Sequence, residues 1–217
     1  MRYFAIVFSS LILSGCSMFG DFEKPDYEVI SNDGDFEIRQ YQGEIVAEVN
    51  VTGSRSDATG KGFRILADYI FGNNIKQEEI SMTAPVNVQK DISEKIDMTA
   101  PVNVVEEEEN SWAVQFYMPS KYSLKTLPKP KNDEIKLYKT EGFIAAAIKF
   151  SGRWSDSNIA EHNEKLKDYI ADNEDYKIIS APIFAFYNDP FTPWFLRRNE
   201  VIYKVAEVEA EGEAQTE

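Results

Sequence analysis

The sequence GEIVAEVNVTG at Gly43–Gly53 returns in pattern as GFIAAAIKFSG at Gly142–Gly152. Strict alternation of apolar residues is typical of a β-strand with one buried face. A glycine follows each predicted strand and ends it. The chain therefore contains the same strand-forming unit twice, with these alternating residues: Ile45, Ala47, Val49 and Val51, then Ile144, Ala146, Ile148 and Phe150.

A helix is predicted immediately after each of these strands. Ser56-Asp57 and Ser155-Asp156 supply side chains that can cap a first helical turn. Each helix then has one apolar face to pack against a sheet, because a stripe with helical spacing follows in each copy: Phe63, Leu66, Ala67 and Ile70, then Ile159, Leu166, Tyr169 and Ile170.

Each copy also begins with a further strand. Phe36 and Ile38 alternate with charged residues ahead of the first copy, as Ile135 and Leu137 do ahead of the second. We therefore predict one α+β domain at 27–205, built from two pseudo-symmetric repeats at about 27–104 and 112–205 that residues 128–133 connect. The expected architecture is a distorted, mainly antiparallel sheet or barrel flanked by two helices.

A second, tighter repeat lies inside the first half. The sequence ISMTAPVNV at Ile80–Val88 recurs as IDMTAPVNV at Ile96–Val104, which predicts two more strands. Proline has no N–H to donate to a β-ladder, so Pro85 and Pro101 predict strands at sheet edges or bulges.

The N-terminus resembles that of a bacterial lipoprotein precursor. Residues 3–13 are apolar apart from two serines, too short a run to span a bilayer but long enough for a secretory signal. The run leads to Leu13-Ser14-Gly15-Cys16, which resembles a lipobox, in which the cysteine is acylated. We predict a signal peptide at 1–15, a lipid anchor at Cys16 and a tether at 16–26. The alternative is an ordinary signal peptide that contains a cysteine.

The same pattern predicts where the chain lies in the cell. A lipidated Cys16 makes the membrane a partner of the protein and places it in a bacterial cell envelope. Ser17 favours the periplasmic face of the outer membrane. At the other end, residues 206–217 combine glutamates with small residues, which predicts a disordered acidic tail.

Composition excludes several classes of function. The chain has 23 Lys and Arg against 37 Asp and Glu, a net charge of −14, which argues against nucleic acid as a partner. It has one cysteine and one histidine, so it can form neither an internal disulfide nor a tetrahedral zinc site from Cys and His. A Ser-His-Asp triad would have to use His162. We therefore predict no metal-ion site and no enzyme activity.

Further segments resemble the SOUL haem-binding protein family. They are Tyr69–Asn74, the Met-Thr-Ala-Pro-Val segments at Met82–Val86 and Met98–Val102, Phe116–Pro119, and Tyr187–Pro190 with Arg197–Val201. The resemblance covers the whole body of the chain. It implies a sheet barrel of two repeats with two helices, and binding of haem or a related tetrapyrrole in an apolar groove beside the first helix.

The predicted first helix offers most of the candidate ligand-binding residues. Phe63, Tyr69 and Phe71 can face a flat aromatic ligand, although Phe63 suits the core equally well. Family members have basic side chains that face the haem propionates, and here Lys61 and Arg64 can take that part.

Three more residues are candidate haem contacts. Met82 and Met98 can line the groove or act as soft iron ligands, although sheet packing is the simpler explanation of their repeated context. His162 lies on the inward stripe of the second helix and can ligate iron, although a hydrogen-bonded structural role is more common for such a position.

Two other functions stay open at this point. One is an anchored surface that contacts a partner in the envelope, which an apolar patch outside the groove would favour. The other is a small-molecule hydrolase, because the expected fold is similar to that of gyrase-inhibitor-like binders, a few of which hydrolyse their ligands. A buried carboxylate with a strongly raised pKa would favour the hydrolase.

Overall fold

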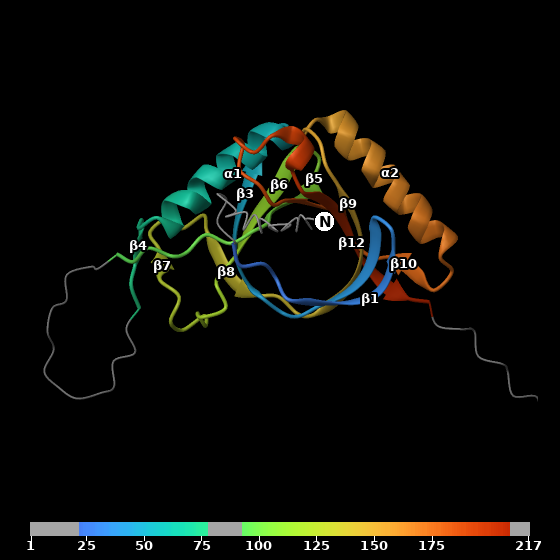
Figure 1. The fold of residues 1–217 in the computed structure, drawn as a ribbon. Coiled ribbons are helices and arrows are strands. Elements are labelled where there is room, and N and C mark those ends of the chain that lie inside the picture. The colour runs from blue at the N-terminus through green and yellow to red at the C-terminus, as the bar shows by residue number, and fades with distance from the viewer. Residues whose placement is uncertain (1–21, 78–92, 209–217) are drawn as a thin grey trace, which may run out of the picture.

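The computed structural model describes residues 22–77 and 93–208. Figure 1 shows a curved sheet with two helices, α1 (Arg55–Ile70) and α2 (Asp156–Asp172), on its outer side. The strands are β1 (Tyr27–Asp33), β2 (Phe36–Tyr41), β3 (Ile45–Thr52), β4 (Asn74–Ile75), β5 (Val102–Glu108), β6 (Ser111–Tyr117), β7 (Lys129–Pro130), β8 (Lys136–Lys139), β9 (Phe143–Phe150), β10 (Tyr176–Ile178), β11 (Ile183–Phe186) and β12 (Asn199–Glu207).

The main sheet is antiparallel and open. Its strands follow the order β1-β2-β9-β12-β11-β5-β6-β3-β8, and β10 pairs with part of β12. The outer strands β1 and β8 do not pair with each other, so the sheet curls without closing into a barrel. The short strands β4 and β7 form a separate pair, and β7 lies in the predicted linker. The predicted α+β class is confirmed.

The predicted duplication is also present. β3 is followed by α1 in the first half, and β9 is followed by α2 in the second. The glycines that end these strands, Gly53 and Gly152, have φ angles of +129° and +118°, a region that other residues rarely adopt. Ser155 caps α2 as predicted, but the cap of α1 is Ser54 rather than Ser56. Ser54 is the extended residue whose side chain accepts from the Asp57 N–H, whereas Ser56 lies within the first turn.

Both faces of the sheet are partly buried. The main hydrophobic core fills the space between the helices and the outer face, with Leu66 and Leu166 among its members. A second cluster on the inner face includes Tyr41, Ala147 and Ile202. Because the sheet curls, strands such as β3 bury side chains on both of their faces, and not only on the apolar face that the sequence predicted.

The strand predicted within Ile96–Val104, at a sheet edge or bulge, is not an edge strand, and the irregularity in β5 lies between Glu106 and Glu108, away from Pro101. β5 lies between β11 and β6 and pairs with both. Pro101 comes immediately before the strand, so its missing N–H removes no bond from the ladder. The first copy of this repeat, Ile80–Val88, lies outside the described residues.

The predicted tether and tail contribute short segments to the domain. Glu23 bridges to Thr99, and its carbonyl accepts a hydrogen bond from the Ala100 N–H at 2.9 Å. β12 continues to Glu207, so the sheet extends into the predicted tail. Cys16 and the predicted signal peptide lie outside the described residues. No helix within 22–77 and 93–208 is long and apolar enough to cross a membrane.

Candidate functional site

An apolar groove lies between α1 and the segments that precede β5 and follow β11. Its volume is about 350 Å³, which is in the range of small-molecule sites. Its walls come from five parts of the chain and are mainly apolar: Phe22, Thr59, Gly60, Phe63, Arg64, Met98, Thr99, Ala100, Val102, Trp154, Phe186, Tyr187, Asn188, Asp189 and Pro190.

Helix α1 presents one side to this groove and another to the sheet. Phe63 is half-buried, and its ring meets Phe116 edge-on at 5.5 Å between centroids. Arg64 is exposed at the rim. Gly62 faces the sheet, where an added Cβ would lie 2.5 Å from the Cβ of Val114. The close approach of helix and sheet at Gly62 thus fixes how Phe63 and Arg64 meet the groove.

In the wall across from α1, polar contacts hold the side chains in place. Trp154 donates from Nε1 to Asn199 Oδ1 at 2.8 Å, and the Arg197 guanidinium lies 4.4 Å from its ring centroid. Asp189 accepts from the Phe191 and Thr192 amides at 2.7 and 3.0 Å, which shapes the turn at the rim. The groove is therefore built from side chains whose orientations are already fixed.

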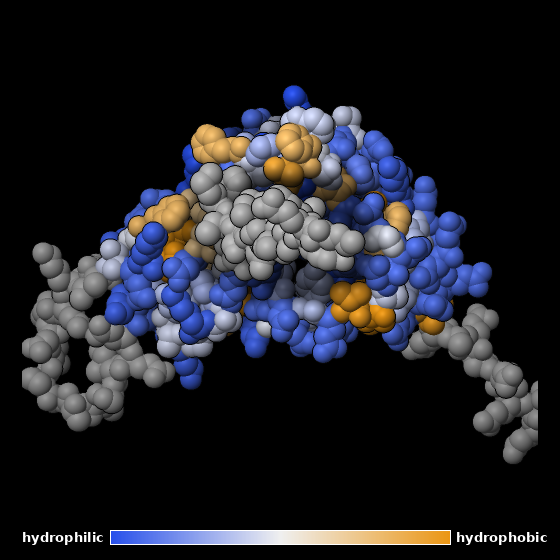
Figure 2. All heavy atoms as spheres, viewed as in Figure 1, coloured by the Kyte–Doolittle hydropathy of each residue, from blue (hydrophilic) through white to orange (hydrophobic). Residues whose placement is uncertain are grey.

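The next turn along the chain is exposed and apolar. A 3₁₀-helix at Trp194–Leu196 follows Phe191, which is 92% exposed. Apolar side chains gather over this loop at the top of Figure 2. We call Phe191, Trp194, Phe195 and Leu196 the aromatic loop. It is an apolar patch beside the groove rather than inside it.

Among the candidates on and near α1, only Phe63 and Arg64 line the groove. Lys61 is exposed, and its Nζ lies 3.3 Å from the Thr52 carbonyl. Tyr69 is buried and donates from its hydroxyl to the Pro128 carbonyl at 2.7 Å. Phe71 is exposed beyond the helix, where the Lys95 ammonium lies 5.8 Å from its ring centroid.

The remaining candidates divide between the groove and other places. Met98 lines the groove. His162 lies on α2, where it stacks on Phe150 at 4.0 Å, and its Nδ1 is 2.7 Å from the Asn158 carbonyl oxygen. Met82 lies outside the described residues.

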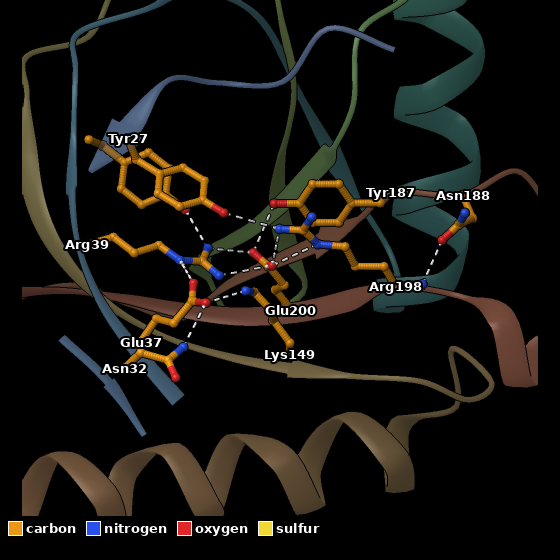
Figure 3. Close-up of polar contacts among 10 residues, drawn as sticks. Tyr27, Asn32, Glu37, Arg39, Lys149, Tyr187, Asn188, Arg198 and Glu200 are labelled. Carbon is orange, nitrogen blue, oxygen red and sulfur yellow. Dashed lines mark hydrogen bonds and ion pairs between the residues drawn. The ribbon is translucent and has the colours of Figure 1, made fainter. Parts of the chain in front are cut away.

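A buried cluster of charged side chains lies on the inner face of the sheet (Figure 3). Arg39 is fully buried and donates to both oxygens of Glu200, at 2.7 and 3.1 Å. It also donates to Glu37 at 2.8 Å, and Glu37 receives a second ion pair from Lys149. Tyr187 links this cluster to the groove, because it lines the groove and donates to Glu200 at 2.9 Å. We call this set the Arg39 cluster.

The charges of the Arg39 cluster satisfy one another. Burial alone would raise the pKa of Glu200, but hydrogen bonds and charges from Arg39 and Arg198 outweigh it and lower the pKa. The pKa of Glu37 is lowered in the same way, by Lys149 and Arg39 against burial. A general base in a hydrolase would need a raised carboxyl pKa, so this cluster has the character of a structural network.

The groove can be tested for its fit to a flat, metal-containing ligand. Within the described residues, no group of three or more His, Cys, Asp and Glu side chains could hold a free metal ion. Burial raises the pKa of Tyr187 well above its usual value, so its hydroxyl stays protonated and is a poor iron ligand. The Met98 thioether is the soft donor in the wall, and Arg64 is a cation at the rim. These residues fit a flat apolar molecule with an anionic edge.

A family model described as SOUL heme-binding protein matches residues 22–204 of the chain. The chain belongs to the SOUL family. A relative named Heme-binding protein 1, from Xenopus laevis, is 27% identical over 190 residues, which cover 85% of this chain and 93% of the relative.

Solved structures share the fold of this SOUL-family chain at low sequence identity. The EcmrR C-terminal domain has a TM-score of 0.56 and 12% identity, covering 84% of this chain and 99% of its own. A hydrolase from Listeria innocua has a TM-score of 0.51 and 10% identity, covering 82% of this chain and 94% of its own. Identities this low establish a common fold and carry no function across.

Sequence reasoning missed most of the wall of this SOUL-family groove. The segments Met98–Val102 and Tyr187–Pro190 carried the family resemblance, yet of their residues only Met98 was a candidate contact. Trp154 and Phe186 gave no signal, because they reach the groove through the packing of α2 and β11 against the rest of the sheet. Phe22 falls in the predicted tether.

Proposed function

We propose that this protein binds haem or a similar flat apolar molecule in the groove beside α1, and that it does so as a binding protein rather than an enzyme. The observation that carries the proposal is the groove itself, an apolar site of about 350 Å³ in a member of the SOUL family. The name of the Xenopus laevis relative points the same way.

The groove favours binding by shape and apolar contact. Its aromatic walls suit a porphyrin face, and Arg64 at the rim suits the carboxylates of propionate side chains. Met98 is the wall residue best able to approach iron. His162 lies on another helix with its ring stacked on Phe150, so a role for it is not part of this proposal.

The test is a hemin titration followed at the Soret band. The wild-type protein should give a saturable shift at micromolar hemin. Arg64→Glu should weaken binding about three- to tenfold, because it places a like charge near the propionates. Lys61→Glu is the matched control, since it makes the same charge change on the same helix outside the groove, and His162→Ala should also bind as the wild type does.

The titration has a clear negative result. Absence of a saturable shift would contradict the proposal. Equal losses of hemin affinity in Arg64→Glu and Lys61→Glu would contradict it as well. Met98→Leu preserves apolar volume and removes the sulfur. A changed Soret maximum in this variant would assign Met98 to the iron, whereas an unchanged one would leave shape and apolar contact as the basis of binding.

We also propose that Cys16 is acylated and holds the domain at a membrane of the bacterial envelope. The six residues that follow Cys16, up to Phe22, can span at most about 20 Å. Phe22 lines the groove together with Pro190, so a tether this short would hold the aromatic loop near the bilayer. Tryptophan and phenylalanine suit the interface between headgroups and acyl chains, which supports contact with lipid.

Fractionation of bacteria that express the full chain tests this anchor. The wild type should sediment with membranes and need detergent for release, and Ser17 leads us to expect the outer-membrane fraction. Cys16→Ala should abolish acylation and shift the protein to the soluble fraction, because residues 22–77 and 93–208 contain no helix long and apolar enough to span a membrane. A wild-type chain that is released without detergent would contradict the proposal.

A further inference from the structure

The aromatic loop belongs to an uncharged stretch of the chain. Residues 190–196 read PFTPWFL and carry no charge, in a protein whose charged residues make up 28% of the sequence. The four large side chains of this stretch are exposed: Phe191 by 92%, Trp194 by 52%, Phe195 by 58% and Leu196 by 63%. An apolar patch of this kind at the surface marks a site of contact with a partner or a membrane.

Hydrogen bonds within the aromatic loop hold its backbone. The Asp189 carboxylate accepts from two amides at the start of the loop. From the other end, the Arg197 guanidinium donates to the Thr192 and Pro190 carbonyls, each at 2.8 Å. Backbone groups that are bonded in this way need no water. The loop can therefore present its side chains to an apolar phase as a preformed tip.

Exposed arginines flank the aromatic loop. Arg64 lies at the rim of the groove, as Pro190 does. Arg153 is exposed next to Gly152, whose N–H donates to the Trp194 carbonyl at 3.0 Å. The protein has a net charge of −14, so two exposed cations here run against its overall charge. Apolar side chains with cations beside them are the combination that binds the interface of a bilayer with anionic lipids.

The groove and the aromatic loop adjoin each other, and the predicted anchor is close to both in sequence. Pro190 lines the groove and Phe191 begins the loop, so the rim and the loop are continuous. Phe22 also lines the groove, and Cys16 comes six residues before it. In Figure 1 the loop lies at the top of the molecule, beside the first turns of α1 and α2. A bilayer that holds an acylated Cys16 would therefore meet the loop and the rim of the groove together.

We propose that the aromatic loop inserts into the interface of the bilayer, and that the groove takes up its flat apolar ligand directly from the lipid phase. This inference rests on the proposed anchor and the proposed groove, and it names the source of the ligand. A porphyrin-like molecule partitions into lipid because both of its faces are apolar. With the loop in the interface, the ligand passes between lipid and groove without crossing water. Arg64 then lies at the level of the headgroups, where it can meet the anionic edge of the ligand.

Quenching of tryptophan fluorescence by brominated lipid tests the insertion. The full chain, reconstituted in vesicles of phosphatidylethanolamine and phosphatidylglycerol, should lose emission when the acyl chains carry bromine. Trp194 is 52% exposed, whereas Trp112 is 8% exposed and Trp154 lies in the groove wall. Trp194→Phe keeps an aromatic ring in the loop and should remove most of the quenching. Flotation of the same vesicles measures whether the chain is attached to them.

Hemin uptake from loaded vesicles tests the route of the ligand. Phe195→Asp should slow the Soret change about tenfold, because it places a charge in the interface. Its titration with hemin in solution should match that of the wild type, since Phe195 does not line the groove. Phe71→Asp is the matched control, because Phe71 is 55% exposed and lies outside the groove lining, and it should leave both measurements unchanged. Phe191→Asp repeats the test if Phe195→Asp does not fold.

The outcomes separate this proposal from those on which it rests. Attached chains without quenching of Trp194, or equal uptake rates in wild type and Phe195→Asp, would overturn it and leave the anchor and the groove in place. A chain that does not float with vesicles would contradict the anchor and this proposal together. No Soret shift in solution would contradict the groove and the uptake route together. A change in Trp194 emission that depends on protein concentration and not on lipid would assign the loop to contact between two copies of the chain, which also overturns the proposal.

Discussion

Replacing Arg39 by methionine is expected to lower the free energy of unfolding by about 3–5 kcal/mol. The substitution keeps apolar volume and removes the charge that pairs with Glu200 and Glu37. The Glu200 side chain is fully buried, so it would remain as a charge with only half-buried Arg198 to offset it. Urea denaturation followed by tryptophan fluorescence measures the change.

A surface ion pair supplies the control for Arg39→Met. Lys165 and Glu161 pair at 2.7 Å on an exposed face of α2. Lys165→Met should change stability by no more than about 0.5 kcal/mol. Adding Glu200→Leu to Arg39→Met should recover part of the lost free energy of unfolding, because it removes the unpaired buried carboxylate. Equal effects of Arg39→Met and Lys165→Met would mean that the Arg39 cluster does not stabilise the fold.

Substituting alanine for each of two glycines in α1 should change the stability of the domain in opposite directions. Gly62→Ala should destabilise the domain by about 1–3 kcal/mol, because the added Cβ would lie 2.5 Å from the Cβ of Val114. Gly60→Ala should stabilise it by about 0.5–1 kcal/mol, because its nearest neighbour is the end of the Arg64 side chain at 3.6 Å and alanine favours helix. Thermal unfolding monitored by circular dichroism compares the two.

Relief of the contact provides a further check on Gly62. Val114→Ala should itself destabilise the domain by creating space, but Gly62→Ala added to it should cost much less than in the wild type. Additive effects of the two substitutions would show that the close approach of α1 to β6 is not the cause.

The main strands and helices could be predicted from the sequence, because the residue patterns that specify them are local. Alternating residues in Gly43–Gly53 and Gly142–Gly152 predicted β3 and β9, and the stripes after them predicted α1 and α2. The cap of α1 was two residues off, since Ser54 and Ser56 have the same chemistry and only the backbone distinguishes them. Closure of the sheet depends on whether its outer strands meet, and no local pattern encodes that.

The site was predicted less well because it depends on which way a helix is rotated. Thr59, Gly60, Phe63 and Arg64 share the side of α1 that faces the groove, whereas Tyr69 belongs to the side that faces the core. The pairing of Arg39 with Glu200 had no sequence signal, since the two residues are 161 positions apart. Separations of this size become contacts only once the strand order is known.

The position of β12 sets the order in which the molecule can be completed. It is the last strand of the described chain, yet it lies inside the sheet and pairs with β9, β10 and β11. During synthesis from the N-terminus, β1-β2-β9 and β11-β5-β6-β3-β8 remain two unjoined groups until Asn199–Glu207 is available. Assembly of the sheet therefore waits until Asn199–Glu207 has been synthesised, and a truncation before Asn199 would leave both groups with unpaired strand edges.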